Sequence, residues 1–153
     1  MSTFIGKYEA KADTKGRIFI PSVYRKLLPE GGRERVVLRE DPDNDCLVIY
    51  PEPVWNKKVE TLQSTLDEWN PDDQMLLIQF VADAEWLDID SQGRILIPKK
   101  TLELISLGNN EVLFVGMMDR FTLWGKQYYE QNKLSSAQFA EKLKDKMKQS
   151  SSL

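Results

Sequence analysis

Two nine-residue stretches of the chain carry the residue types that could bind an anion. Residues 13–21 read Asp-Thr-Lys-Gly-Arg-Ile-Phe-Ile-Pro, and residues 90–98 read Asp-Ser-Gln-Gly-Arg-Ile-Leu-Ile-Pro. The arginine of each stretch can pair with the aspartate four residues earlier, or it can offer its planar donors to a phosphate or to guanine O6 and N7. The aspartate can also accept hydrogen bonds from the N–H groups of a turn, and we favour this role for Asp13 and Asp90. The role of the two arginines stays open at this level.

The chain contains few of the residue combinations from which catalytic sites and metal sites are usually built. The chain has no histidine, and Cys46 is its single cysteine, so neither a histidine-paired thiol nor a zinc ligand set can be assembled. The glycines form no phosphate-binding loop or dinucleotide fingerprint, and Ser22 lacks the flanking glycines of a nucleophile elbow. We therefore expect no enzyme activity, no metal, no cofactor and no small-molecule substrate.

The remaining residues of the two stretches shape the backbone. Gly16 and Gly93 allow a conformation at the tip of a hairpin that other residues avoid. A proline after each stretch fixes a backbone angle with which a helix can begin. The isoleucines alternate along their strands and should all point into the core; they are Ile18, Ile20, Ile95 and Ile97.

The elements around the two stretches repeat in the same order, which is strand, turn, strand, helix, two strands and a helix. The first half is predicted to have strands over 7–11, 17–20, 35–39 and 46–50, with helices starting at Pro21 and Pro53. The second half is predicted to have strands over 84–88, 94–97, 111–116 and 120–124, with helices starting at Pro98 and over 126–131. Gly31, Gly32 and Gly108 are expected to end the first helix of each half. One half alone buries too little apolar surface, so the two halves should share a core.

Three helices carry the remaining apolar residues. One is predicted from an Asn70 cap to Val81, and one from Ser136 with residues after Lys148 expected to be disordered. In the latter, apolar side chains recur every four residues: Phe139, Leu143 and Met147. The helix from Pro53 has a similar stripe, expected in the core or at a subunit interface; it comprises Trp55, Val59, Leu62, Leu66 and Trp69.

Charge is distributed unevenly along a chain whose net charge is -3. Residues 1–29 carry six basic and two acidic side chains, whereas residues 52–90 carry two basic and ten acidic ones. A polyanion responds to the local patch, although plain solvated faces would give the same pattern. Residues 126–148 carry six lysines and three acids. This tail could contact DNA, pack against a neighbouring subunit or remain solvated, and we favour the last.

The composition is that of an ordinary globular protein, with 41% of the 153 residues hydrophobic and 29% charged. The apolar runs are far shorter than the roughly 20 residues that cross a bilayer, so no membrane contact is expected. The chain does not open with a basic region followed by an apolar stretch, and it has one cysteine. Both features favour the cytoplasm over a secreted location.

The motif Asp-x-Lys-Gly-Arg-Ile-x-Ile-Pro, followed by a short helix, resembles the AbrB-type swapped-hairpin DNA-binding fold. Two such motifs in one chain of this length closely resemble the bacterial MraZ family, transcriptional regulators linked to cell-division and cell-wall gene clusters. Residues 36–38 and 47–51 with Trp55 fit the first half of that family, and residues 112–116 and 119–124 fit the second. The resemblance covers roughly residues 3 to 130.

This resemblance implies an α+β, mainly β fold. Two tandem swapped-hairpin AbrB-like units, each β-turn-β-helix-β-β, are expected to pack as a pseudo-twofold barrel with flanking helices. The expected divisions are repeat 1 over 5–52, linking helices over 53–82, repeat 2 over 83–126 and a C-terminal helical tail over 127–153. In the family, chains form rings that present N-terminal hairpins to repeated boxes of double-stranded DNA.

Carried onto this chain, the resemblance assigns DNA binding to the first motif. The expected DNA-binding residues are Arg17, Lys15, Lys7, Lys11 and Thr14. The residues expected to build the motif are Asp13, Gly16, Asp90, Gly93 and Arg94. In the second copy Gln92 stands in place of Lys15, and Glu85 and Asp88 replace the basic flank. The second copy should therefore bind phosphate poorly.

Two functions follow. The first is a sequence-specific DNA-binding transcriptional regulator, a cytoplasmic, nucleoid-associated homo-oligomer in the form of a ring. The alternative is an oligomeric protein-interaction module without DNA binding. The acidic net charge, the Trp55/Trp69 stripe and the need for partners would favour this alternative. The subunit interface is expected at Trp55, Val59 and Leu62.

Overall fold

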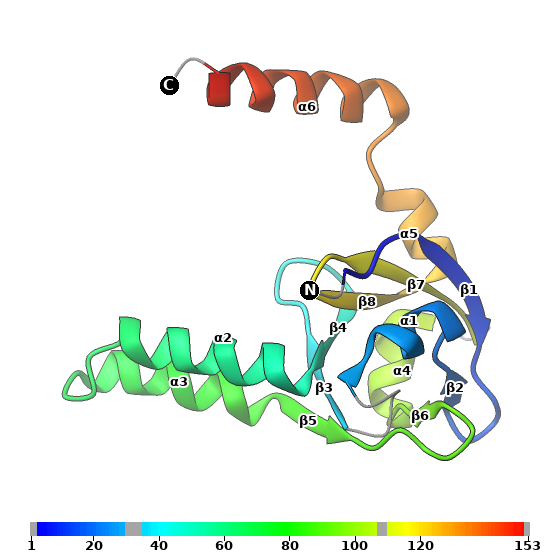
Figure 1. Cartoon of the computed structure of the whole chain (residues 1–153), viewed down its shortest axis with the longest axis horizontal. Helices are drawn as coiled ribbons and strands as arrows, with labels where there is room; N and C mark the ends of the chain where they lie inside the picture. The colour runs from blue at the N-terminus through cyan, green and yellow to red at the C-terminus, as the bar shows by residue number, and fades with distance from the viewer. Residues whose placement is uncertain (1–2, 30–34, 107–109, 152–153) are drawn as a thin grey trace.

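The computed structural model describes residues 3–29, 35–106 and 110–151 (Figure 1). The first half contains β1 (Lys7–Lys11), β2 (Arg17–Phe19), α1 (Ser22–Leu27), β3 (Val36–Glu40), β4 (Cys46–Pro51) and α2 (Glu52–Thr65). After α3 (Pro71–Ala82), the second half contains β5 (Ala84–Leu87), β6 (Arg94–Leu96), α4 (Lys99–Ser106), β7 (Glu111–Met117), β8 (Arg120–Gly125) and α5 (Lys126–Asn132). The chain continues into α6 (Ser136–Ser151). The predicted order of strands and helices is confirmed, while the glycines expected to end α1 and α4 (Gly31, Gly32 and Gly108) lie outside the described residues.

Strands from both halves build one six-stranded antiparallel sheet, in the order β1-β7-β8-β4-β3-β5. Strand β1 of the first half pairs with β7 of the second, with Lys7 opposite Val115. Strand β5 of the second half pairs with β3 of the first, with Leu87 opposite Val36. The expected barrel is wrong, because the described strands leave the sheet open with β1 and β5 at its two edges.

The strands that follow the two turns form a separate antiparallel ribbon, β2 with β6. Ile18 lies opposite Ile95 at its centre. Two further bonds lengthen the ribbon: the Ile97 N–H donates to the Gly16 carbonyl at 2.9 Å, and the Ile20 N–H donates to the Gly93 carbonyl at 3.0 Å. The two repeated motifs therefore lie side by side, although 77 residues separate them in sequence.

The main core lies between this ribbon, α1, α4 and the sheet. All four isoleucines of the motifs are at most 2% exposed, as predicted. Tyr24 of α1 is fully buried among the rings of Phe4, Phe114 and Phe121, and its hydroxyl donates to the Gly6 carbonyl at 2.8 Å. Because the ribbon, α1, α4 and the sheet all contribute side chains to this core, the core holds the ribbon against the sheet.

A second, smaller core lies where the α2–α3 hairpin joins the sheet. Trp55 is 7% exposed and stacks on Phe80 of α3, with ring centroids 5.2 Å apart. The Asn70 side chain caps α3 as predicted, accepting hydrogen bonds from the N–H groups of Asp72 at 2.9 Å and Asp73 at 3.1 Å. Helix α2 ends at Thr65, so the predicted helical stripe does not extend to Trp69, whose exposed fraction is 85%.

Helix α6 extends away from the rest of the chain (Figure 1). Every residue from 131 to 150 is exposed. The disorder predicted after Lys148 is wrong up to Ser151, because the helix continues to that residue. Among the described helices, none combines the length and apolar character needed to cross a membrane.

Candidate nucleic-acid interface

The first turn is built around the Asp13 carboxylate. Its Oδ1 accepts hydrogen bonds from the N–H groups of Lys15 and Arg17, both at 2.9 Å, and its Oδ2 accepts one from Arg17 Nε at 2.7 Å. The Gly16 N–H closes the turn by donating to the Asp13 carbonyl at 3.0 Å, with a φ of +93° at the glycine. The aspartate therefore caps the turn and holds the arginine at the same time.

The second turn repeats this geometry. Asp90 Oδ1 accepts from the N–H groups of Gln92 at 2.9 Å and Arg94 at 2.8 Å, and its Oδ2 accepts from Arg94 Nε at 2.8 Å. Gly93 has a φ of +84°. The positive φ predicted for the glycine of each motif is thus present in both turns.

Each aspartate leaves its arginine oriented and still able to bind. Hydrogen bonds, first from the Arg17 backbone N–H and then from the Arg17 side chain and the Lys15 N–H, lower the pKa of Asp13 to about 2. The corresponding bonds from Arg94 and Gln92 lower the pKa of Asp90. Both carboxylates are therefore charged at neutral pH. Only Nε of each arginine binds the aspartate, so its two terminal nitrogens can donate to a phosphate or to a base edge.

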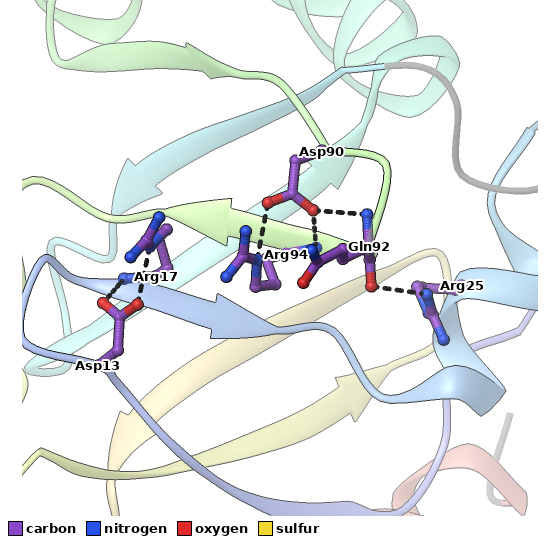
Figure 2. A network of polar contacts seen from close by, with 6 residues as sticks. All are labelled: Asp13, Arg17, Arg25, Asp90, Gln92 and Arg94. Atoms are coloured by element: carbon purple, nitrogen blue, oxygen red, sulfur yellow. Dashed lines mark hydrogen bonds and ion pairs between the residues drawn. The ribbon is translucent and has the colours of Figure 1, made fainter.

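The two arginines project from the same side of the β2–β6 ribbon (Figure 2). Arg17 lies opposite Leu96, and Arg94 lies opposite Phe19, so these four residues share one face. The arginine side chains are 37% and 22% exposed, and Phe19 and Leu96 are 57% and 54% exposed. Sequence reasoning treated the motifs as two sites and missed the two apolar residues, although their alternation with buried isoleucines could have identified them.

A further cation, Arg25 of α1, lies against the second turn. Its NH1 donates to the Gln92 carbonyl at 3.2 Å (Figure 2). Its side chain also occupies the space that a Cβ on Gly93 would need. The corresponding residue of the second half, four positions after Pro98, is the buried Leu102, so this position supplies no cation to the first turn. Sequence analysis missed this contact, because nothing local to Arg25 indicates a turn 67 residues away.

The other predicted DNA-binding residues are distributed along β1 and the first turn. Thr14 and Lys15 are exposed at the tip of the turn, and Lys11 is exposed where β1 leads into it. Lys7 is at the other end of β1, about 13 Å from Lys11 at the rise of a strand. Its amino group lies 5.7 Å from the centre of the Tyr129 ring. The structure therefore brings Thr14, Lys15 and Arg17 together, and it places Lys7 apart from them.

The predicted interface residues on α2 have different surroundings. Trp55 belongs to the core, the first of the two placements left open by its spacing. Val59 packs against the same cluster, and Leu62 is half-buried. A subunit interface at these residues stays a prediction. No group of side chains suited to hold a metal ion occurs among the described residues.

Comparison with known proteins places the chain in one family. The family model described as "MraZ protein, putative antitoxin-like" matches residues 3–78 and 80–149. A protein of Bacteroides fragilis named transcriptional regulator MraZ is 39% identical over 97% of this chain and 94% of its own length. Proteins of the same name from Bacteroides thetaiotaomicron and Phocaeicola vulgatus are each 40% identical, over 96% and 94% of this chain and 94% and 93% of their own lengths. These relatives are named as regulators rather than as enzymes. With its two repeated motifs covered by the family model, the chain belongs to the MraZ family.

Proposed function

We propose that this chain is a sequence-specific regulator of transcription that reads double-stranded DNA with the exposed face of the β2–β6 ribbon. The observation that carries this proposal is the pair of arginines that two aspartates hold on one face. A two-stranded ribbon fits the major groove, which is about 12 Å wide. An arginine whose terminal nitrogens are free to donate can bind guanine there in a bidentate manner.

Within this face, the first turn is assigned the larger share of binding. Lys15 and Thr14 extend beyond Arg17 at the tip, and Lys11 can add a phosphate contact beside them. At the second turn Gln92 replaces the lysine, and the Arg94 side chain is less exposed than that of Arg17. Lys7, at the far end of β1, is assigned a weaker contact that does not depend on base sequence.

The proposal extends to the architecture in which the hairpins act. The exchange of β1 and β5 between the halves supports an AbrB-like swapped-hairpin assignment. We further propose that chains form a ring whose N-terminal hairpins meet repeated DNA boxes upstream of a cell-division or cell-wall gene cluster. Several weak hairpins on one ring bind more tightly than one hairpin does, without any new contact. This function would place the protein in the cytoplasm, at the nucleoid.

The test is a binding titration on DNA from upstream of the protein's own gene, at two salt concentrations. Arg17→Ala should weaken binding by about 5- to 160-fold, since a bidentate guanine contact contributes roughly 1–3 kcal/mol. Arg94→Ala should weaken it less than threefold. Lys15→Ala should reduce the slope of log K against log salt concentration by about one, because one phosphate contact is lost. The control Lys57→Ala, which removes the same charge from α2, should leave the slope unchanged.

Equal losses from Arg17→Ala and Arg94→Ala would contradict the unequal roles of the two turns. Oligomers that bind neither this DNA nor unrelated DNA at physiological salt would instead support the alternative function, a protein-interaction module.

A further inference from the structure

Helix α6 presents an apolar stripe that no other described part of its own chain covers. Phe139, Leu143 and Met147 are 57%, 49% and 63% exposed, and their spacing places them on one face. Lys142 and Lys146 flank this face on one side, and Lys144 flanks it on the other. The helix therefore offers an apolar stripe with a positively charged rim.

Helix α3 presents a second apolar surface with the opposite charge. Its exposed apolar side chains are Met75, Leu76, Ile78 and Val81, each between 43% and 58% exposed. Asp72 lies in its first turn and Asp83 directly follows its last. From residue 59 to residue 93 the chain has nine acidic side chains and neither lysine nor arginine. This surface therefore suits an apolar partner that carries positive charge.

We infer that α6 of one chain docks on α3 of a second copy. The two surfaces carry opposite charges. The two helices are also of comparable length, about 24 Å for α6 and about 18 Å for α3 at the rise of a helix. Another apolar surface, a groove of about 750 Å³ beside α2, is a poorer match for α6. Lys57 and Lys58 line that groove together with the ion pair of Arg120 and Asp119, and its net positive charge would repel the lysines of α6.

A contact between copies also agrees with the placement of the helices. In the view of Figure 1, α2 lies between α6 and α3 of the same chain. Because α6 and α3 are different parts of the chain, each chain can dock its α6 on one neighbour and bind the α6 of another on its α3. Such head-to-tail contacts close into a ring or continue into a filament. The inference rests on the ring of the proposed function and names the surfaces that would hold it together.

The first test is light scattering on the full chain without DNA, at micromolar concentration. Leu143→Asp should reduce the mass to that of the monomer, because it places a charge within the apolar stripe. Gln149→Asp makes the same change in charge on another side of the helix, and it should keep the wild-type mass. Circular dichroism of both variants checks that α6 stays helical. A monomeric wild-type chain, or a Leu143→Asp variant of unchanged mass, would overturn the inference.

The second test identifies the acceptor by cross-linking two different chains. Met147→Cys and Ile78→Cys are purified separately, mixed and treated with a short bis-maleimide. The native Cys46 is buried and its pKa is raised to about 12, so it should not react. The mixture should give a covalent dimer, whereas Gln149→Cys mixed with Ile78→Cys should not. A bond that forms only within the double variant Met147→Cys/Ile78→Cys would show that α6 docks in its own chain and would refute the contact between copies.

These tests separate the assembly from DNA binding. If the inference holds, Leu143→Asp binds a single DNA box with near wild-type affinity and loses at least tenfold on an array of boxes. A ring that assembles as described but ignores DNA would contradict the proposed function alone. A monomer that binds DNA arrays as tightly as the wild-type chain would contradict the α6–α3 contact alone.

Discussion

Replacing the glycine of each turn by alanine should destabilise the protein by different amounts. Both glycines have a positive φ, +93° for Gly16 and +84° for Gly93. At Gly16 an added Cβ would lie 2.5 Å from the Ile97 carbonyl oxygen, which belongs to the backbone of the paired strand. At Gly93 the Cβ would instead meet the side chain of Arg25, which can rotate away and would lose only its long, exposed 3.2 Å hydrogen bond to the Gln92 carbonyl.

The magnitudes follow from these surroundings. A left-handed backbone costs an L-residue about 1–2 kcal/mol, and this cost applies to both variants. At Gly16 the paired strand must also move, which breaks the 2.9 Å hydrogen bond from the Ile97 N–H to the Gly16 carbonyl. The loss of that bond adds about 1 kcal/mol. We therefore expect Gly16→Ala to lose about 2–3 kcal/mol and Gly93→Ala about 1–2 kcal/mol.

Urea denaturation of the two variants measures this difference, with tryptophan fluorescence and circular dichroism as independent probes. In a thermal scan, 1 kcal/mol corresponds to about 2–4 °C in Tm for a chain of this size, so Gly16→Ala should melt roughly 4–12 °C below the wild type. The reasoning is refuted if Gly93→Ala is as unstable as Gly16→Ala. The expected difference arises because the added Cβ meets backbone at Gly16 and a movable side chain at Gly93.

Three further predictions concern single side chains. The pKa of Asp13 is lowered to about 2, so its contribution to stability is complete above about pH 4 and is lost as the pH falls through 2; an NMR titration with a carboxyl midpoint near 4 would contradict this. Burial raises the pKa of Cys46 to about 12, so a thiol reagent at pH 8 should label it only after unfolding, and rapid labelling of the native protein would disagree. Tyr24→Phe removes a donor to the Gly6 carbonyl, which still accepts from the Gly116 N–H at 3.0 Å, and should cost about 1 kcal/mol in urea denaturation; an unchanged stability would contradict this contribution.

Local patterns in the sequence predict most of the individual elements. The glycine of each turn, the alternating isoleucines and the Asn70 cap all act within a few residues of themselves, so their structural effect can be derived from spacing. The same reasoning explains why the element order is correct in both halves. The prediction that the helix from Pro53 extends to Trp69 is wrong. Leu66 and Trp69 continue the helical spacing of apolar residues, although α2 ends at Thr65.

Contacts between distant segments could not be derived in this way. The pairing of β2 with β6 depends on how two hairpins fill one core, and no feature of either strand specifies its partner. For the same reason the sequence did not show that Arg17 and Arg94 share a face, or that Arg25 reaches the second turn. The open edges at β1 and β5 likewise result from the order of six strands rather than from the sequence of either edge strand.

The exchange of strands between the halves has a consequence for the synthesis of the chain. Lys7 of β1 is paired with Val115 of β7, which the ribosome adds 108 residues later. At about 5–20 residues per second, β1 waits roughly 5–20 s for its partner, whereas β3 and β4 can pair almost at once. During this interval β1 is an unpaired strand open to other nascent chains. Its exposed side chains are Lys7, Glu9 and Lys11, and such charges on an edge strand oppose pairing with another chain until its own partner has been made.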